Sequence, residues 1–598
     1  MAGPAVAPAV AGAGTPDRGP AAGRRALASA PYLVLPVALL LWLLSLRSVD
    51  LAAMNDLGLL QVLPPAYWAA VALLTVGFSL ALRDRRVRTG WLVAYLLGLI
   101  AMIHATPSLL YPTLRYSWAW KHLAVLDAMI RNNGPVPNAE GFDIYNQWPG
   151  FFVLNGLVLR VTGLHSALGY AAWAPLVTNL LLLAPLVLLY RAVSTDRLLV
   201  FGALWIYYSA SWVGQDYFAP QAFAFLLFVT VLALVVRQLP DGLAPGGARP
   251  SAGADRIGRR SGRLPLILLL EAAIVVSHQL TPLMLICVLT ALALPRRNRR
   301  AVLPALAGAL AFTLAWDLTV ARRFIDDNFG DFVRALTTPD GNIVSGLAGL
   351  GAAAPGQVVV AWVDRALSAT VILLALAALW RRPWLRRTGL PAAALAPVPL
   401  LVANSYGGEM IFRVYLFALP SCAFLIAALL FRPGPRPRLR AVGSAGVLLA
   451  LLGGLFFGYY SKEKMNYFTP GEVAAARQLV ALAPPGSVVV SVTGNVPGGS
   501  AEYDLHQRIQ LNQDSPETRQ LLLTDPLAGL LRATAFAAPG TPAYLILNRG
   551  QANECFLTGA LPADTVARLG TALDQAPRFT VVFRNDDAVI YRYVPRAT

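Results

Sequence analysis

The chain has 598 residues, of which 57% are hydrophobic and only 13% are charged. A soluble protein carries about a quarter charged residues, so this composition excludes an ordinary soluble protein. The formal net charge of +18 comes mainly from arginines in short loops between apolar runs. It does not indicate one contiguous basic surface, which argues against nucleic-acid binding.

The first 460 residues alternate between apolar runs and short polar loops. Residues 1–30, rich in Ala, Gly and Pro, are predicted to be a disordered cytoplasmic tail. Between residues 31 and 460, runs close to the ~20 apolar residues that cross a bilayer recur. Counting them against the arginine-rich loops predicts about 13 transmembrane helices with a cytoplasmic N-terminus. The chain is therefore predicted to be a polytopic α-helical protein that crosses the cytoplasmic membrane many times.

Arginine clusters mark every second loop. They are Arg83–Arg88, Arg296–Arg300, Arg381–Arg387 and Arg432–Arg440. Because positively charged loops stay on the cytoplasmic side, these clusters are predicted to lie together on the cytoplasmic face. The Gly-, Pro- and Ala-rich loop 238–263 belongs to the same face and is predicted to be disordered.

The long loop 104–150 is predicted on the opposite, outer face and gathers polar and aromatic side chains. Its candidate site residues are Arg115, Trp118, Lys121, His122, Asp143, Tyr145 and Trp148. Charged groups near lipid are costly and so indicate a functional site, and indole rings beside carboxylates suit sugars. An aromatic belt at the membrane boundary is the alternative, although it leaves the charged residues unexplained. The next apolar stretch, Phe151–Val161, would place Arg191–Arg197 outside if it crossed, so it is predicted to lie on the outer membrane surface.

A second polar group follows in the outer loop Trp212–Gln221. Gln215 and Asp216 lie there between two apolar spans. A carboxylate in a dry cleft can act as a general base, or it can hold a divalent cation such as Mg²⁺ or Mn²⁺. Asp216 also fits the N-cap of the next helix, with Pro220 in its first turn, and these roles are compatible.

Two further outer segments supply an imidazole and a guanidinium. His278 and Gln279 suit a phosphate or a sugar hydroxyl, although a lone histidine is more often a packing residue. The segment Asn404–Arg413 ends in Arg413, whose natural partner at the headgroup level is a lipid phosphate. Glu409 lies four residues earlier on the same helical face and is predicted to pair with Arg413.

The segment Ala321–Leu336 is an exception to the charge rule. Arg322 and Arg323 fall in an outer loop and are followed by acidic residues, with which they are predicted to pair. The helical spacing of its apolar residues predicts either a lid that lies on the membrane or a solvated connector.

Residues 461–598 have the patterning of a soluble domain. The predicted strands and helices are Glu472–Leu482 (helix), Ser487–Val492, Ala543–Leu547, Ala563–Ala576 (helix), Phe579–Phe583 and Ala588–Tyr593. The last two strands are predicted to form a hairpin. This part is therefore predicted to be an extracytoplasmic α/β domain.

The arrangement resembles the GT-C superfamily of membrane glycosyltransferases, especially its actinobacterial branch of uncharacterised members. Three features carry the resemblance: a long first outer loop with the element Tyr145–Gly150, an acid in a short later loop (Asp216), and an outer Arg413 near the last spans. An α/β domain follows, as in that branch. The stretches Gln215–Gln221 and His278–Pro282 also look like those of its members.

The resemblance implies an enzyme that moves a hexose or pentose from a polyprenyl-phosphate donor to an envelope glycan, lipid or protein, with inversion. An acid in the first outer loop of such enzymes deprotonates the acceptor hydroxyl, but residues 106–121 contain no acid. The candidates for this base are Asp143, Asp127 and Asp216, or Asp50 and Asp56 if the first pair of spans is the start of the family's fold.

The resemblance also implies roles for basic and aromatic residues. Arg413, with Lys121 or Arg115, would neutralise the leaving phosphate. The aromatic residues that would stack on the sugar are Tyr145, Trp148 and Trp118. The C-terminal domain would bind the acceptor glycan. No cofactor is certain, because three cysteines and five scattered histidines lack metal-site spacing, and a donor phosphate held by arginine does not require a cation.

Two other classes of function stay open. A transporter or flippase for an envelope lipid or glycan precursor would place polar residues near the bilayer midplane, where only Glu271 fits. A non-catalytic scaffold of envelope assembly would use the C-terminal domain as a binding module. Such a scaffold would tolerate changes at Asp143, Asp216 and Arg413.

Overall fold

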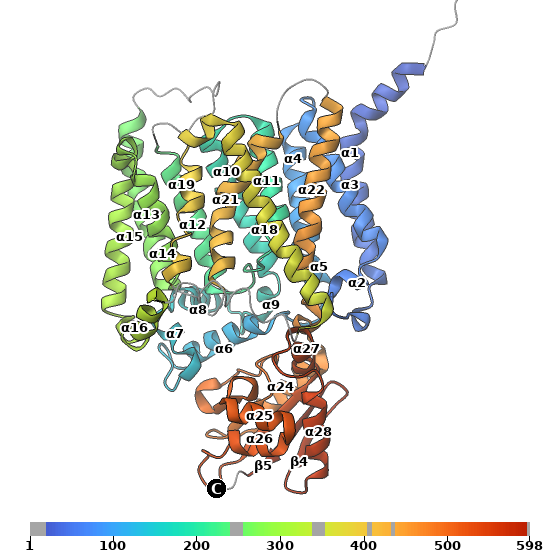
Figure 1. Cartoon of the computed structure of the whole chain (residues 1–598), viewed down its shortest axis with the longest axis vertical. Helices are drawn as coiled ribbons and strands as arrows, with labels where there is room; N and C mark the ends of the chain where they lie inside the picture. Colours follow the sequence, from blue (N-terminus) through green and yellow to red (C-terminus); the bar gives the residue numbers. More distant parts are fainter. Residues whose placement is uncertain (1–18, 240–254, 338–352, 404–408, 432–436, 595–598) are drawn as a thin grey trace, which may run out of the picture.

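The computed structural model describes residues 19–239, 255–337, 353–403, 409–431 and 437–594. Parts of the predicted tail 1–30, of loop 238–263, of Asn404–Arg413 and of Arg432–Arg440 therefore lie outside the described residues. The described chain forms a helical bundle, a layer of short helices at one end of it, and a small α/β domain beyond that layer (Figure 1).

The bundle is built from apolar helices. Among the described residues, seven are long and apolar enough to cross a membrane, and five further apolar helices are shorter. The long ones lie in α1 (Gly19–Ser45), α3 (Pro65–Arg83), α10 (Ala174–Val193), α15 (Arg299–Leu318), α18 (Pro355–Arg381), α21 (Met410–Leu430) and α22 (Pro437–Tyr460). The shorter ones are α4 (Thr89–His104), α8 (Gly150–Thr162), α11 (Arg197–Ala210), α12 (Pro220–Val236) and α14 (Thr281–Ala293). The mostly helical membrane domain is confirmed, while the predicted count of crossings stays a prediction.

Other helices complete the bundle and its connections. The helix α13 (Asp255–Ser277) packs between α12 and α15. The short connecting helices are α2 (Leu59–Val62), α5 (Thr106–Leu110), α19 (Leu390–Leu395) and α20 (Leu400–Ala403).

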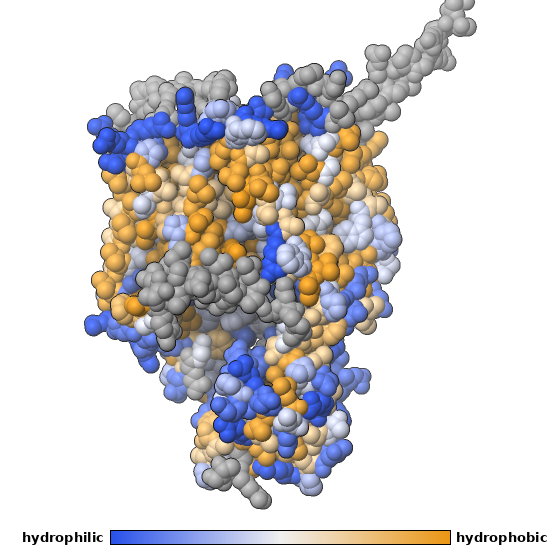
Figure 2. Space-filling view, viewed as in Figure 1, coloured by the Kyte–Doolittle hydropathy of each residue, from blue (hydrophilic) through white to orange (hydrophobic). Residues whose placement is uncertain are grey.

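Hydrophilic side chains form a band at the end of the bundle opposite the C-terminal domain (Figure 2). There Arg83 Nη2 donates a hydrogen bond to the Arg440 carbonyl at 3.1 Å. Similarly, Arg297 Nη2 donates to the Arg387 carbonyl at 3.5 Å. The predicted arginine clusters thus meet in pairs.

A layer of short helices lies between the bundle and the C-terminal domain (Figure 1). It contains α6 (Ser117–Arg131), α7 (Ile144–Gln147), α8 and α9 (Leu168–Ala171). The predicted helix Phe151–Val161 is α8, whose Val153 and Val161 are 63% and 77% exposed. Exposed apolar side chains along this helix fit a position on the membrane surface.

The helix α16 (Arg322–Thr337) docks on this layer. Two ion pairs join successive turns of the helix, as predicted: Arg322–Asp326 at 3.5 Å and Arg323–Asp327 at 3.8 Å. The backbone N–H of Phe324 donates to Gln147 Oε1 at 3.1 Å, and its ring meets Trp148 edge to face at 5.2 Å. The exposed ion pairs stabilise the fold little, so packing against α15 and α20 and the contacts with Gln147 and Trp148 hold this helix in place.

The C-terminal domain is a five-stranded sheet with helices. The strands are β1 (Val488–Ser491), β2 (Gln507–Gln510), β3 (Ala543–Asn548), β4 (Thr580–Arg584) and β5 (Ala588–Tyr593), in the order β2-β1-β3-β5-β4. The first three are parallel, and β5 runs antiparallel to β3 and β4. The helices are α24 (Pro470–Leu482), α25 (Pro516–Thr524), α26 (Pro526–Ala533), α27 (Arg549–Thr558) and α28 (Thr565–Gln575). The predicted strands, hairpin and two helices are confirmed.

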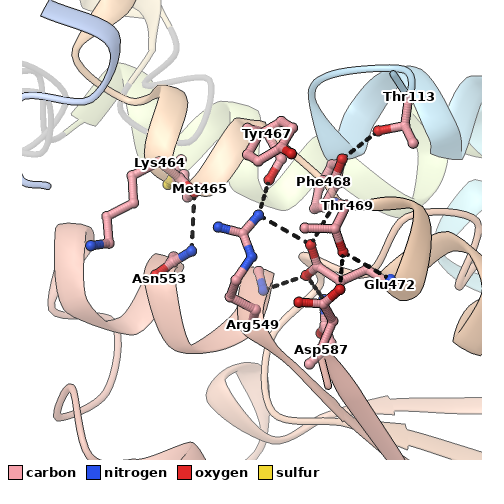
Figure 3. Close-up of polar contacts among 12 residues, drawn as sticks. Thr113, Lys464, Met465, Tyr467, Phe468, Thr469, Glu472, Arg549, Asn553 and Asp587 are labelled. Carbon is pink, nitrogen blue, oxygen red and sulfur yellow. Dashed lines mark hydrogen bonds and ion pairs between the residues drawn. The ribbon is translucent and has the colours of Figure 1, made fainter. Parts of the chain in front are cut away.

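A buried carboxylate organises the start of this domain (Figure 3). Glu472 is fully buried and accepts hydrogen bonds from the backbone N–H of Thr469 at 2.9 Å and of Gly550 at 2.6 Å. Arg549 Nη2 lies 3.2 Å from the same side chain. With Thr469 as N-cap, Glu472 completes a capping box at α24.

Three further contacts hold the domain against the helical layer. The hydroxyl of Thr113 donates to the Phe468 carbonyl (Figure 3). The Tyr116 N–H donates to the carbonyl of Asn466 at 2.9 Å, where α23 (Glu463–Asn466) ends. Arg131 and Asp504 form an ion pair at 2.7 Å.

Candidate functional site

Two pairs of neighbouring residues meet where the bundle faces the C-terminal domain. They are Arg115 and Tyr116, just before α6, and Asp216 and Tyr217, just before α12. The rings of Tyr116 and Tyr217 lie edge to face with centroids 4.5 Å apart. Arg115 and Asp216 both contact Tyr459, and we call this group the first half of the site. Tyr116 and Tyr217 lie next to it, beside His122, and we call this group the second half.

The first half is centred on Asp216. Its Oδ2 accepts hydrogen bonds from Asn179 Nδ2 at 2.8 Å and from the Tyr459 hydroxyl at 2.9 Å, and lies 2.9 Å from His104 Nδ1. Burial alone would raise the pKa of Asp216, but His104, Arg115 and Tyr459 outweigh it and hold this pKa below its ordinary value. Asp216 is therefore ionised at neutral pH.

The predicted helix-capping role of Asp216 is wrong. The N-cap of α12 is Ala219, without a side-chain cap, and only the predicted place of Pro220 in the first turn is confirmed. The carboxylate is instead turned toward three helices of the bundle, α4, α10 and α22, because each offers it a hydrogen-bond donor.

Arg115 lies in the same half. Its Nη2 is 3.2 Å from Glu463, which is fully buried, and its guanidinium carbon is 5.1 Å from the centre of the Tyr459 ring. Burial would lower the pKa of Arg115, but Glu463 and Tyr459 raise it above its ordinary value. Within the described part of the chain, its Nε and Nη1 have no hydrogen-bond partner. A buried guanidinium with N–H groups left over is suited to an anion.

The second half contains His122. Its ring stacks on Tyr217, with centroids 5.8 Å apart. Nδ1 is 2.9 Å from the Phe218 carbonyl, so it carries the proton, and Nε2 accepts from the Tyr145 hydroxyl at 3.1 Å. Burial lowers the pKa of His122 to about 4, so the ring is neutral.

Arg413 belongs to the second half. Its Nη2 lies 2.6 Å from Glu409, which confirms the predicted pair, and its side chain is 8% exposed whereas that of Glu409 is 51% exposed. His278 accepts the N–H of Thr281 at 3.2 Å and so helps to begin α14. Burial, then the charge of Arg413, lowers the pKa of His278 to about 3. The imidazole of His278 and the guanidinium of Arg413, predicted from separate segments, thus lie within range of electrostatic interaction.

Asp143 has different surroundings. Its two carboxylate oxygens accept hydrogen bonds from Asn146 and Gln147, both at 3.1 Å, in α7. Burial, then Asp504 and to a lesser extent Asp143, raises the pKa of Tyr503 in the C-terminal domain. Asp143 therefore faces the junction with that domain.

The other candidate bases also have local roles. Asp56 accepts the N–H of Gly356 at 2.8 Å at the start of α18, and Asp50 caps a short turn at Ala52. Asp127 is half-buried on α6, where burial raises its pKa.

The predicted aromatic residues divide between surface and core. Trp118 is 40% exposed, and Lys121 Nζ lies 4.0 Å from the centre of its ring. Trp148 is only 5% exposed and packs against α16.

Lys121 reaches the C-terminal domain, because a Cβ placed on Gly494 would lie 3.1 Å from its Nζ. Gln215 and Gln279 are half-buried.

Sequence reasoning missed the residues that hold the first half together. They are His104, Asn179, Tyr459 and Glu463. Each is a single polar residue at or near the end of an apolar helix, so no local motif distinguishes it. Only His104 could have been identified from the sequence, because it lies at the start of the long outer loop that holds the other candidate residues. Asp364, close to Trp212 and Gly458 in the bundle, was also missed.

A metal site is not evident in the part of the chain that the structure describes. No three His, Cys, Asp or Glu side chains are grouped there as metal ligands. Asp216 lies with one histidine, an amide and a phenol, which is a set better suited to holding a carboxylate in place than to holding a cation.

Comparison with known proteins gives only distant likenesses. No protein-family model matches the chain, and no curated protein matches it. Similar solved structures include an oligosaccharyltransferase of Archaeoglobus fulgidus in complex with zinc and sulfate (13% identity, 79% of this chain and 70% of that one, TM-score 0.45). Another is ArnT of Cupriavidus metallidurans bound to undecaprenyl phosphate (15% identity, 84% and 98%, TM-score 0.46), and its apo form has a TM-score of 0.44. At these values we take nothing about the site or the activity from the likeness.

Proposed function

We propose that the protein is an integral-membrane glycosyltransferase. It transfers a sugar from a polyprenyl-phosphate donor to an envelope glycan, lipid or protein outside the cell, with inversion. The observation that carries this proposal is a site with one buried arginine in each half, Arg115 and Arg413, and with the ionised and oriented carboxylate of Asp216 in the half of Arg115. The arginines stabilise the leaving phosphate, while the carboxylate accepts the proton of the incoming hydroxyl.

Asp216 is the favoured base. Three donors converge on its Oδ2, and no hydrogen bond engages Oδ1 within the described residues. A base must be deprotonated before it can act, and the lowered pKa of Asp216 secures that form. Both oxygens of Asp143 are engaged within α7, so Asp143 is the alternative base.

The donor phosphate lies between the two arginines. Arg413 is oriented by Glu409, and Arg115 is oriented by Glu463. A guanidinium binds phosphate through paired, charge-assisted hydrogen bonds, and a buried one loses less of that interaction to water. Tyr145 and Trp118 are the aromatic residues placed to contact sugar near α6.

The proposed orientation puts the site outside the cell. The arginine-rich end of the bundle is opposite the C-terminal domain (Figure 2), and positive loops remain cytoplasmic. The C-terminal domain and the site would then both be extracytoplasmic, where the donor lipid presents its sugar in the outer leaflet.

Glu271 is the observation that favours transport as a second candidate. It is 1% exposed, and neither of its carboxylate oxygens has a hydrogen-bond partner among the described residues. However, its neighbour is Gly308 of α15, away from both halves of the site. A flippase would move a fluorescent polyprenyl-phosphate lipid between leaflets of sealed vesicles without changing it chemically.

Purified protein in lipid nanodiscs tests the enzyme proposal. It should transfer radiolabel from a polyprenyl-phosphate sugar to an envelope acceptor extract, and nuclear magnetic resonance should show the opposite anomeric configuration in the product. Failure to transfer any of a panel of hexose and pentose donors, combined with lipid flipping in vesicles, would favour the transporter.

A further inference from the structure

A small cavity lies in the C-terminal domain near the carboxyl end of its central parallel strand. The loop after β1 and the strand β2 line it, with Ser491, Gly494, Arg508 and Gln510 among the residues at its wall. Its volume is about 30 Å³. A cavity of ~10–15 Å³ holds one water molecule, so this one has room for a small polar group such as a carboxylate.

The topology of the sheet places this cavity where α/β domains bind ligands. The strand β1 lies between β2 and β3. The chain therefore runs from β1 to β2 on one side of β1 and then crosses to β3 on its other side. Ligands of open parallel sheets bind outside the carboxyl ends of the strands at such a switch point.

The loop after β1 is rich in glycine because its backbone is closely approached. A Cβ on Gly494 would lie 2.7 Å from Gln510 Oε1 and 3.1 Å from Lys121 Nζ. Gly498 has a positive φ of 74°, and a Cβ on it would meet the Trp120 ring at 3.7 Å. The loop is therefore pressed against α6 of the helical layer.

Two cations from different domains lie near this cavity. Arg508 of β2 lines it, whereas Lys121 of α6 lies behind its wall, next to Gly494. Burial lowers the pKa of Lys121, Glu554 raises it, and the nearby charge of Arg508 lowers it further. The two cations repel each other, and an anion bound beside them would offset that repulsion.

Trp118 extends this neighbourhood toward solvent. Its ring contacts Lys121 Nζ and is 40% exposed. An exposed indole beside a buried ammonium suits a sugar ring that carries an acidic group.

We propose that the junction of α6 with the C-terminal sheet is a second binding site, in which Lys121 and Arg508 hold a carboxylate or phosphate of an acidic acceptor glycan. That the bound glycan is the acceptor rests on the proposed function, whereas the anion site itself does not. Lys121 is then an acceptor-binding residue rather than a clamp for the donor phosphate.

Direct binding to the full-length protein in neutral-lipid nanodiscs tests this site. The probes are fluorescent oligogalacturonate, which carries carboxylates, a glycerol-phosphate oligomer, and a neutral oligogalactose of the same length. At least one anionic probe should bind ten times more tightly than the neutral one, and its affinity should fall as salt rises. Equal binding of the anionic and neutral probes would overturn the proposal.

Variants assign the binding to these residues. Lys121→Met and Arg508→Gln should each weaken anionic binding about tenfold, as expected when one charged hydrogen-bonding partner is lost. Arg477→Gln, at an exposed position on α24, is the matched control and should change nothing. If the first two variants misfold, Gly494→Ala keeps both charges but crowds Lys121, and it should weaken anionic binding as well. Full anionic binding in the folded variants would contradict the site.

The same experiment separates the two proposals. If the protein binds anions in a way that depends on Lys121 but transfers no sugar, the anion site is supported and the proposed glycosyltransferase activity is contradicted. If the protein transfers sugar but binds its acceptor equally well after substitution of Lys121 and Arg508, the proposed activity is supported and the anion site is contradicted.

Discussion

The hydroxyl of Tyr459 donates a hydrogen bond to Oδ2 of Asp216 at 2.9 Å, which joins the loop before α12 to the end of α22. His104 and Asn179 reach the same oxygen. The carboxylate is consequently fixed by helices that lie far apart in the sequence. The charge of Arg115 also helps to hold the pKa of Asp216 below its ordinary value.

Asp216→Asn should abolish sugar transfer, because an amide cannot accept the proton of the acceptor. A positioned general base contributes about 10²–10⁴-fold, so the rate should fall by that factor while donor binding is unchanged. Steady-state transfer and equilibrium donor binding measure the two quantities.

Asp143→Asn is the matched control for that variant and should retain most of the activity, since both oxygens of Asp143 are engaged within α7. The reverse pattern, with an active Asp216→Asn and an inactive Asp143→Asn, would move the base to the junction with the C-terminal domain.

Arg413→Ala should weaken binding of tritiated polyprenyl phosphate by about 10- to 100-fold, because a charged hydrogen-bond partner of the phosphate is lost. Arg413→Lys should recover only part of this, since an ammonium does not make paired bonds. Arg322→Ala is the control, because Arg322 also pairs with an acid four residues away but is exposed. An Arg413→Ala protein with unchanged affinity would exclude the clamp.

Acidification between about pH 6.5 and pH 4 should remove the stability that His122 and His278 contribute as neutral side chains. Burial lowers the pKa of His122 to about 4 and that of His278 to about 3, so both are neutral when folded. Their folded pKa values are below the unfolded value of ~6.5, so their stabilising effect is complete above that pH and is lost as the pH falls.

Thermal unfolding in nanodiscs, followed from pH 7.5 to pH 4.5, measures this loss. Each histidine contributes up to about 1.4 kcal/mol per pH unit below 6.5. The pKa of Asp216 is lowered in the folded protein, so the stability that Asp216 contributes is lost only as the pH falls below the unfolded value of ~3.9, outside this window. The difference in stability between the unmodified protein and His122→Gln should shrink as the pH falls through this window, and a difference that does not change with pH would show that the imidazole of His122 is not buried in the neutral form.

Glu472→Gln should loosen the C-terminal domain. Glu472 is fully buried, pairs with Arg549 and accepts two backbone N–H groups (Figure 3). Arg549 is 30% exposed, so the main cost is that of leaving polar groups around the buried Glu472 poorly paired, which is about 1–3 kcal/mol. Limited proteolysis of the full-length protein should cut the segment after α22 faster, while Glu517→Gln, an exposed position, should leave the rate unchanged. Equal proteolysis of both variants would contradict the role of Glu472.

The segment order of the fold was largely predictable from sequence because its signals are local. Apolar runs and arginine clusters define the bundle. Short apolar runs predict the buried strands β1 and β3, and the turn residues between β4 and β5 predict the hairpin. The strand β2 was missed because Gln507–Gln510 is a mostly polar edge strand without an apolar pattern.

The candidate site was predictable only in part, because its geometry depends on tertiary contacts. The pair Glu409–Arg413 is four residues apart and could be predicted, whereas Arg115 and Glu463 are far apart in the sequence and meet only in the folded chain. Asp216 was identified as a candidate, yet its predicted capping role was wrong because tertiary donors outcompeted the local one.

An experimental structure of the protein with a bound polyprenyl phosphate tests the central claim most directly. We predict that the phosphate lies within hydrogen-bond distance of Arg413 and Arg115, with Oδ1 of Asp216 on the side from which the acceptor hydroxyl would approach the donor sugar. A phosphate bound at the arginine-rich end of the bundle, or against Glu271 in its middle, would contradict the account.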